Sequence, residues 1–173
     1  MKRVVITGIG VVSCLGNYQE EVYQSLLNSK SGITFSEEYK EYNLKSHVHG
    51  LPKIKLEDHV DRKIIRFMGA GSAYNYVAMS EAVKDSGLEE KDVSNISTGM
   101  IMGSGGPSIQ NVILAADKTR EKNPKKWDLL LFQEQCQALH QQHWQYHLKL
   151  KELITLLVQH VLLVVIVLEM QWN

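Results

Sequence analysis

The apolar residues of the first 126 positions alternate between the patterns of strands and of helices. Residues 3–12 (RVVITGIGVV) are β-branched and apolar on both faces, which is typical of a strand buried between two layers. Residues 98–103 (TGMIMG) have the same character and predict a second buried strand. Shorter strands are expected at 32–35 and 46–50, within an otherwise polar and loop-rich stretch.

Helices are predicted between these strands. Asn17 followed by Glu20 resembles a capping box, which opens a helix that continues to about residue 28. Pro107 follows a tight glycine-rich loop at residues 103–106 and fits the first position of a helix. That helix is expected to end near residue 120.

The longest helical pattern covers residues 61–85. It is broken at residues 69–71, where two glycines occur, and it stops before Gly87, which suits a left-handed C-cap. Because strands alternate with helices along the chain, the sequence predicts an α/β fold with a layered architecture.

The composition changes abruptly after Lys126. All 12 glycines and all three prolines precede this point, and residues 127–173 contain no Gly, Pro, Ser or Arg. The same residues hold all three tryptophans and four of the seven histidines. Since turns draw on Gly, Pro, Asn, Asp and Ser, a segment depleted in them is poorly equipped to fold back on itself. We therefore expect a globular segment at 1–126 and a segment without native fold at 127–173.

The overall charge excludes one large class of function. Lys and Arg together number 19, as do Asp and Glu, so the formal net charge is zero. A nucleic-acid-binding protein needs a basic excess to neutralise phosphates, so no nucleic acid is expected as a partner. The apolar fraction of 44% and the charged fraction of 22% also argue against a disordered chain.

The cysteines and glycine-rich turns suggest no metal or nucleotide site. Cys14 and Cys136 cannot build a disulfide framework, and nothing matches the ligand spacing of zinc. The turn after residues 3–12 lacks the acidic residue that a dinucleotide fingerprint requires at the end of the next strand. The loop at 103–106 lacks the Gly-Lys-Ser/Thr ending of a phosphate-binding loop. A reduced, cytoplasmic protein is the expectation.

Five segments, taken in order, resemble a known family. KRVVITGIGVVSCLGN, SGITF, KSHVHG, DRKIIRFM and GSGG look like the N-terminal part of a bacterial β-ketoacyl-acyl carrier protein synthase, and the SHVHG and DRKIIRFM stretches favour type I. The resemblance is collinear from Met1 to about Lys126 and covers about the first third of a family member. It implies a thiolase-like fold of layered α-β-α units, of which this chain holds only the first part of the N-terminal half.

The resemblance also implies an activity, the elongation of fatty acids by decarboxylative Claisen condensation. Family members use a cysteine nucleophile and two histidines, act on substrates carried on the phosphopantetheine of acyl carrier protein, need no other cofactor and form homodimers. This sequence has no Ser-Ser-Ala-Cys motif around Cys14 or Cys136, and the histidines after Lys126 match no family position. No catalytic residue is therefore assigned, and we expect an inactive, truncated relative.

The resemblance assigns a role to a group of basic residues. By themselves, three cations at the start of a helix would be a solvated face. The family, however, uses the matching positions to hold the acidic carrier protein, as a basic patch attracts an acidic partner. The expected carrier-protein-binding residues are Arg62, Lys63, Arg66, Lys122 and Lys125.

Two other functions remain open from the sequence. One is a carrier-protein-binding module that uses the basic residues without chemistry. The other is a membrane protein anchored by residues 153–168, a run of 16 residues that is shorter than the roughly 20 needed to span a bilayer. No membrane association is expected.

A single lost base would explain residues 127–173. Lys125 and Lys126 can be encoded by six adenines, and one more adenine yields Lys-Lys-Met-Gly-Pro, which rejoins the family pattern. The same shifted frame permits Ser-Ser-Ala-Cys from the codons of residues 154–161. We expect resequencing of the gene to reveal this frame, open beyond the codon of Asn173 and encoding two further histidines. A stop codon in the shifted frame before the cysteine would contradict the hypothesis.

Overall fold

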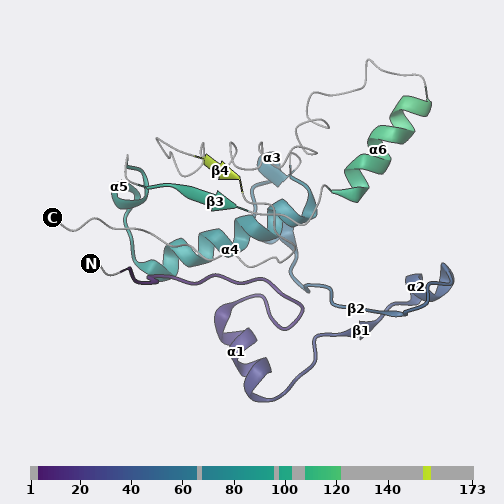
Figure 1. The fold of residues 1–173 in the computed structure, drawn as a ribbon, viewed down its shortest axis with the longest axis horizontal. Coiled ribbons are helices and arrows are strands. Elements are labelled where there is room, and N and C mark those ends of the chain that lie inside the picture. The colour runs from purple at the N-terminus through teal and green to yellow at the C-terminus, as the bar shows by residue number, and fades with distance from the viewer. Residues whose placement is uncertain (1–3, 66–67, 96–97, 103–107, 122–153, 157–173) are drawn as a thin grey trace.

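The computed structural model describes residues 4–65, 68–95, 98–102, 108–121 and 154–156. In chain order the elements are α1 (Gln19–Leu27), β1 (Thr34–Phe35), α2 (Glu37–Glu41), β2 (Val48–His49), the 3-10 helix η1 (Leu56–Asp58), α3 (Arg62–Ile65), α4 (Ala70–Ser86), α5 (Glu90–Val93), β3 (Met100–Met102), α6 (Ile109–Arg120) and β4 (Ile154–Leu156). Figure 1 shows α4 at the centre of this arrangement.

Helix α4 is the longest described element, with 17 residues, and it ends one residue beyond the predicted 61–85 pattern. The predicted break is confirmed, because Gly69 is the extended N-cap of α4. The predicted C-cap is also confirmed, since Gly87 has a φ of 67° and is left-handed. The buried side chains of α4 are mostly small: Ser72, Ala73, Asn75, Val77, Ala78, Met79 and Ala82. Small side chains let another chain segment come close to the helix backbone.

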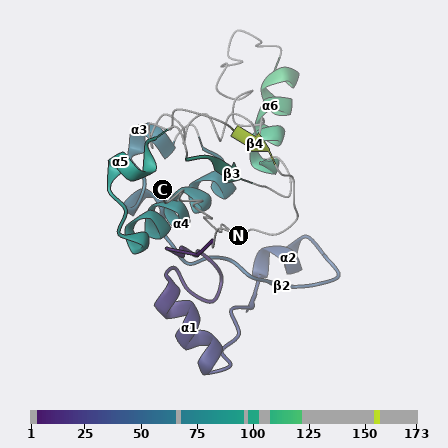
Figure 2. The same cartoon turned by 60° about the vertical axis from the view of Figure 1, so that its left-hand side comes forward.

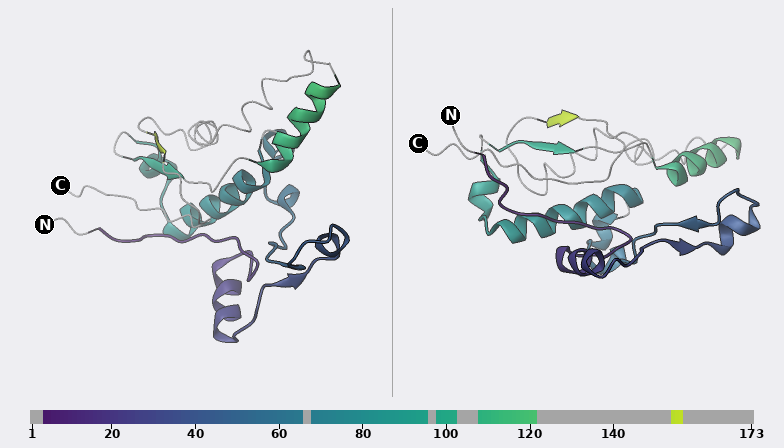
Figure 3. Two further views of the ribbon diagram at one scale, coloured as in Figure 1. Left: turned by 45° about the vertical axis from the view of Figure 1, so that its right-hand side comes forward. Right: turned by 60° about the horizontal axis from the view of Figure 1, so that its bottom comes forward.

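Residues 4–12 make this close approach and run alongside α4 (Figures 1 and 3). A Cβ on Gly10 would overlap the carbonyl oxygen of Ala78 and lie 2.8 Å from the nitrogen of Ala82. A Cβ on Gly8 would overlap the carbonyl oxygen of Ala82. The two glycines therefore bring one backbone against another, where any side chain would force them apart.

Two carboxylates of α4 hold residues 4–12 in place through hydrogen bonds. The Ile9 N–H donates to Oδ2 of Asp85 at 2.9 Å, and the Val11 N–H donates to Oε2 of Glu81 at 3.3 Å. The other oxygen of Glu81 accepts from the N–H of Gln19, the first residue of α1, at 3.2 Å. Glu81 thus joins α4, the N-terminal segment and the beginning of α1.

The predicted buried strand at residues 3–12 is wrong. Within the described part of this segment only Ile9 takes part in a β-bridge, and Val4, Val5 and Ile6 are 55–63% exposed. The β-branched pattern anticipates a layer on each face, whereas α4 covers one side only. Carboxylates of α4 accept two of the backbone N–H groups of the segment.

The short strands expected at 32–35 and 46–50 are confirmed as β1 and β2. They form an antiparallel hairpin in which Thr34 is paired with His49 and Phe35 with Val48. Helix α2 lies between them in the chain and was not predicted; its N-cap is Ser36, whose side chain accepts from the Tyr39 N–H. Figure 2 shows the hairpin and α2 extending away from α4.

Cys14 packs at the base of this hairpin. A Cβ on Gly32 would lie 2.5 Å from the carbonyl oxygen of Cys14, and one on Gly50 would lie 3.1 Å from its Sγ. Gly32 therefore leaves room for both the backbone and the Sγ of the cysteine, and Gly50 leaves room for its side chain. The Cys14 thiol is free and half-buried.

The helix predicted to end near residue 28 is confirmed as α1, but its expected capping box is wrong. The N-cap is Tyr18, without a side-chain cap hydrogen bond. Glu21, rather than Glu20, reaches back and accepts from the Asn17 N–H at 2.7 Å. The helix begins one residue later than the motif implies, so the carboxylate one position further along faces the free N–H.

The strand predicted at 98–103 is confirmed as β3. It pairs in parallel with β4, and Met100, Ile101 and Met102 are aligned with Ile154, Thr155 and Leu156. The predicted helix up to about residue 120 is confirmed as α6, whereas α5 was not predicted. Strand β4 is the only part of 127–173 that is described, so the boundary at 126 stays a prediction.

Replacing Gly10 with alanine should destabilise the fold by about 1–3 kcal/mol, because the new methyl group would meet rigid helix backbone. Gly71→Ala is the matched control. Gly71 lies within α4, and a Cβ added there would have no neighbouring atom within 4 Å. Alanine at this position should therefore be neutral or stabilising. Urea unfolding of the two variants tests this, and a Gly10→Ala variant as stable as the parent would contradict the packing.

Alanine at the two hairpin glycines should have graded effects. We expect Gly32→Ala to be the more destabilising, by about 1–3 kcal/mol, since its Cβ meets the Cys14 carbonyl oxygen. Gly50→Ala should cost less, because the obstacle is the end of a side chain. Adding Cys14→Ala should relieve most of the effect of Gly50→Ala but only part of that of Gly32→Ala, because the Cβ at position 32 still meets the carbonyl oxygen of residue 14. A double-mutant cycle by thermal unfolding measures this, and equal relief at both positions would contradict it.

Candidate functional site

Helix α3 carries two of the predicted basic residues, and Asp61 directly precedes it. The Asp61 carbonyl accepts the N–H groups of Ile64 and Ile65 at 2.8 and 2.9 Å, which starts the helix. Its side-chain Oδ1 accepts the Lys63 N–H at 2.7 Å. Asp61 is therefore the N-cap of α3, a position where Asp, Asn and Ser are all favoured.

The hydrophobic core fixes the orientation of α3. Val12, Val60, Val77 and Ala78 form a buried cluster, against which Ile64, Ile65 and several other apolar side chains pack. Because the second half of α3 faces the core, its first two side chains point outward. Arg62 and Lys63 are both exposed.

Two of the five predicted carrier-protein-binding residues can be placed. Arg62 and Lys63 lie side by side at the start of α3, as expected. Arg66, Lys122 and Lys125 lie outside the described residues. Asp61 was not predicted as part of this surface, although an Asp immediately before a helix is a common N-cap signal.

Arg62 and Lys63 are free to meet a partner. The described ion pairs join Lys91 with Glu89 and Arg120 with Asp117. Within the described residues, neither Arg62 nor Lys63 belongs to an ion pair, so their charges are not neutralised by a fixed neighbour. We call Asp61, Arg62 and Lys63 the α3 patch.

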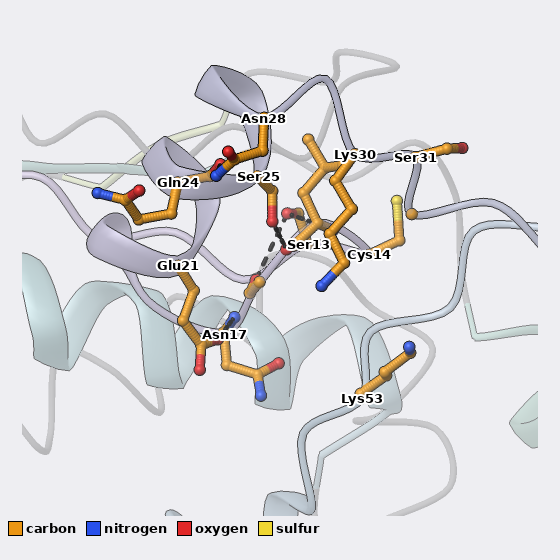
Figure 4. Close-up of a pocket in the computed structure, with 13 residues that line it drawn as sticks. Ser13, Cys14, Asn17, Glu21, Gln24, Ser25, Asn28, Lys30, Ser31 and Lys53 are labelled. Carbon is orange, nitrogen blue, oxygen red and sulfur yellow. Dashed lines mark hydrogen bonds between the residues drawn. The ribbon is translucent and has the colours of Figure 1, made fainter.

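A second feature is a cleft of about 420 Å³ beside α1 (Figure 4). Its walls are the turn at 13–17, one face of α1, residues 30–32 and Lys53. The turn is closed by the Ser13 N–H, which donates to the Gly16 carbonyl at 2.9 Å. The Ser25 hydroxyl donates to the Leu15 carbonyl at 2.8 Å and holds the turn against α1.

Cys14 contributes to the lining of the cleft. Among the described lining residues, none is a histidine that could act as a base for nucleophilic catalysis. The described histidines lie against aromatic rings instead, with centroid distances of 5.9 Å for His47 and Phe35 and 5.3 Å for His49 and Tyr39. Cys14 itself packs closely against Gly32 and Gly50.

Two other features, a metal site and a membrane-spanning helix, are absent from the described ranges. There, no group of three His, Cys, Asp or Glu side chains is arranged to hold a metal ion. No helix in the same ranges is long and apolar enough to cross a membrane. Most of the apolar run at 153–168 falls outside them, and residues 154–156 form strand β4.

Comparison of the sequence with known proteins gives a consistent result. Residues 1–141 match the family described as Beta-ketoacyl synthase, N-terminal domain. The chain is 48% identical over 120 residues to 3-oxoacyl-[acyl-carrier-protein] synthase 1 of Haemophilus influenzae and 46% identical over 121 residues to that of Escherichia coli. Each alignment covers 69% of this chain and 30% of the relative. The chain thus spans about a third of the length of these relatives.

Comparison of the structure gives the same fold. A β-ketoacyl synthase from Burkholderia phymatum superposes with a TM-score of 0.72 at 20% identity, covering 91% of this chain and 38% of the other. A type II polyketide ketosynthase, solved in complex with its acyl-carrier protein, superposes with a TM-score of 0.65 at 16% identity, covering 86% and 39%. The thiolase-like fold predicted from the sequence is confirmed, as a part of the complete fold.

The predicted resemblance to type I synthases is also confirmed. Relatives named synthase 1 reach 43–50% identity, whereas synthase 2 of Staphylococcus aureus is 32% identical over 126 residues. With a family match over 141 residues and a ketosynthase fold around α4, this chain belongs to the β-ketoacyl synthase family, and to its N-terminal domain.

Proposed function

We propose that this chain carries a carrier-protein-docking surface of a type I 3-oxoacyl-[acyl-carrier-protein] synthase. The corresponding whole enzyme would elongate fatty acyl chains in the cytoplasm by decarboxylative condensation. The observation that carries the proposal is the pair of exposed cations, Arg62 and Lys63, at the start of α3. Because the second half of α3 packs on the core, both side chains point toward solvent. In the described residues no carboxylate pairs with them.

The physical chemistry of the pair suits an acidic protein partner. Exposed charges of one sign accelerate encounter with a partner of opposite sign and help to select it. The solved relative that binds an acyl-carrier protein has the same fold, which supports carrier protein as the partner of this chain. The acyl group would arrive on the phosphopantetheine of that protein, and no further cofactor would be needed.

Docking and chemistry are separable in this chain. The 173 residues contain no Ser-Ser-Ala-Cys motif, and Cys14 is held in a packing role. We therefore propose that the chain by itself binds carrier protein without condensing its substrates, which makes it a binding module.

Arg62→Glu and Lys63→Glu should each weaken the binding of acyl carrier protein by roughly three- to tenfold at low salt, with a smaller effect at high salt. Fluorescence titration of labelled carrier protein measures this. The matched control is Lys84→Glu, an exposed charge reversal in the last turn of α4, which should leave binding within about twofold of the parent. Equal weakening by all three variants would contradict a local docking surface.

The same purified chain should give no condensation of acyl- and malonyl-carrier protein. Product formation can be followed by mass spectrometry of the carrier protein. Turnover that is abolished by Cys14→Ala or by Cys136→Ala would overturn the separation of binding from chemistry.

A further inference from the structure

Asp61 places a negative charge within the surface that is proposed to attract an acidic partner. It directly precedes Arg62 and Lys63, and it is itself exposed. Its carboxylate accepts a backbone N–H, that of Lys63, at 2.7 Å. It forms no ion pair with either neighbouring cation in the described part of the chain, so its charge faces solvent together with theirs.

The local structure of α3 needs an acceptor at position 61 but not a charge. Asn and Ser cap helices about as well as Asp, since each presents an oxygen to the same N–H. A neutral capping residue would start α3 equally well and leave the surface more positive. The carboxylate therefore has an electrostatic effect that helix capping alone does not require.

We propose that Asp61 limits the affinity of the α3 patch for an acidic carrier protein. This inference rests on the proposed docking function. Its carboxylate repels an acidic partner and lowers the local positive potential, so Arg62 and Lys63 must be met directly for binding to succeed. A carrier protein has to dissociate after each delivery, and moderate affinity shortens its residence time.

The test uses the full chain and labelled acyl carrier protein. Asp61→Asn and Asp61→Ser keep a capping oxygen and remove the charge. Both should bind roughly two- to fivefold tighter at low salt, and the gain should vanish at high ionic strength. Two chemically different neutral caps guard against a folding defect in one of them, and circular dichroism verifies that each variant is folded.

Two controls separate the charge from other effects. Asp58→Asn removes an exposed carboxylate from η1, three residues earlier in the chain, and should change affinity by less than about 1.5-fold. Asp61→Ala removes charge and cap together, and it should bind more weakly than Asp61→Asn because α3 loses its first side-chain hydrogen bond.

The outcomes distinguish this inference from the function on which it rests. If the parent chain binds no carrier protein, both are overturned. If the parent binds and Arg62→Glu weakens binding, but Asp61→Asn and Asp61→Ser bind like the parent, only the role of Asp61 is overturned. Equal tightening by Asp58→Asn would likewise overturn it, because net charge rather than position would then govern affinity.

Discussion

The contact between the backbone of residues 8–10 and the backbone of α4 is the constraint on which the described structure depends. Gly8 and Gly10 allow it on one side, and Ala78 and Ala82 on the other. Close approach brings the N–H groups of this segment within reach of α4 carboxylates, and Glu81 extends the connection to the first N–H of α1. Without the glycines, these hydrogen bonds could not form in this geometry.

The same contact connects the core to the surface. Val12 ends the glycine-containing segment and joins Val60, Val77 and Ala78 in the buried cluster. Ile64 and Ile65 pack on that cluster, and their burial turns the first residues of α3 to solvent. The α3 patch is held in place by side chains that pack two residues further along the helix, and in the described residues its cations have no fixed ionic partners. They are consequently available to another protein.

The candidate site was partly predictable. Arg62 and Lys63 could be chosen only because their positions match a family, since three cations at the start of a helix are ordinarily a solvated face. Within the described residues, their freedom from ion pairs depends on side-chain placement that no residue pattern specifies. Cys14 is similar: the sequence leaves a free thiol unexplained, and the structure places it between Gly32 and Gly50. The cap that Asp61 provides is different, because an Asp directly before a helix is a sequence signal for it.

The sequence by itself determined the features that depend on neighbours along the chain. The break at Gly69, the left-handed end at Gly87 and the short β1 and β2 strands follow from backbone preferences of a few consecutive residues. Tertiary structure decided whether residues 4–12 form a strand, because an apolar β-branched segment becomes one only when another strand accepts its hydrogen bonds. Here Asp85 and Glu81 of α4 accept two of them. Those carboxylates lie about seventy residues away in the chain, a separation that no local pattern can bridge.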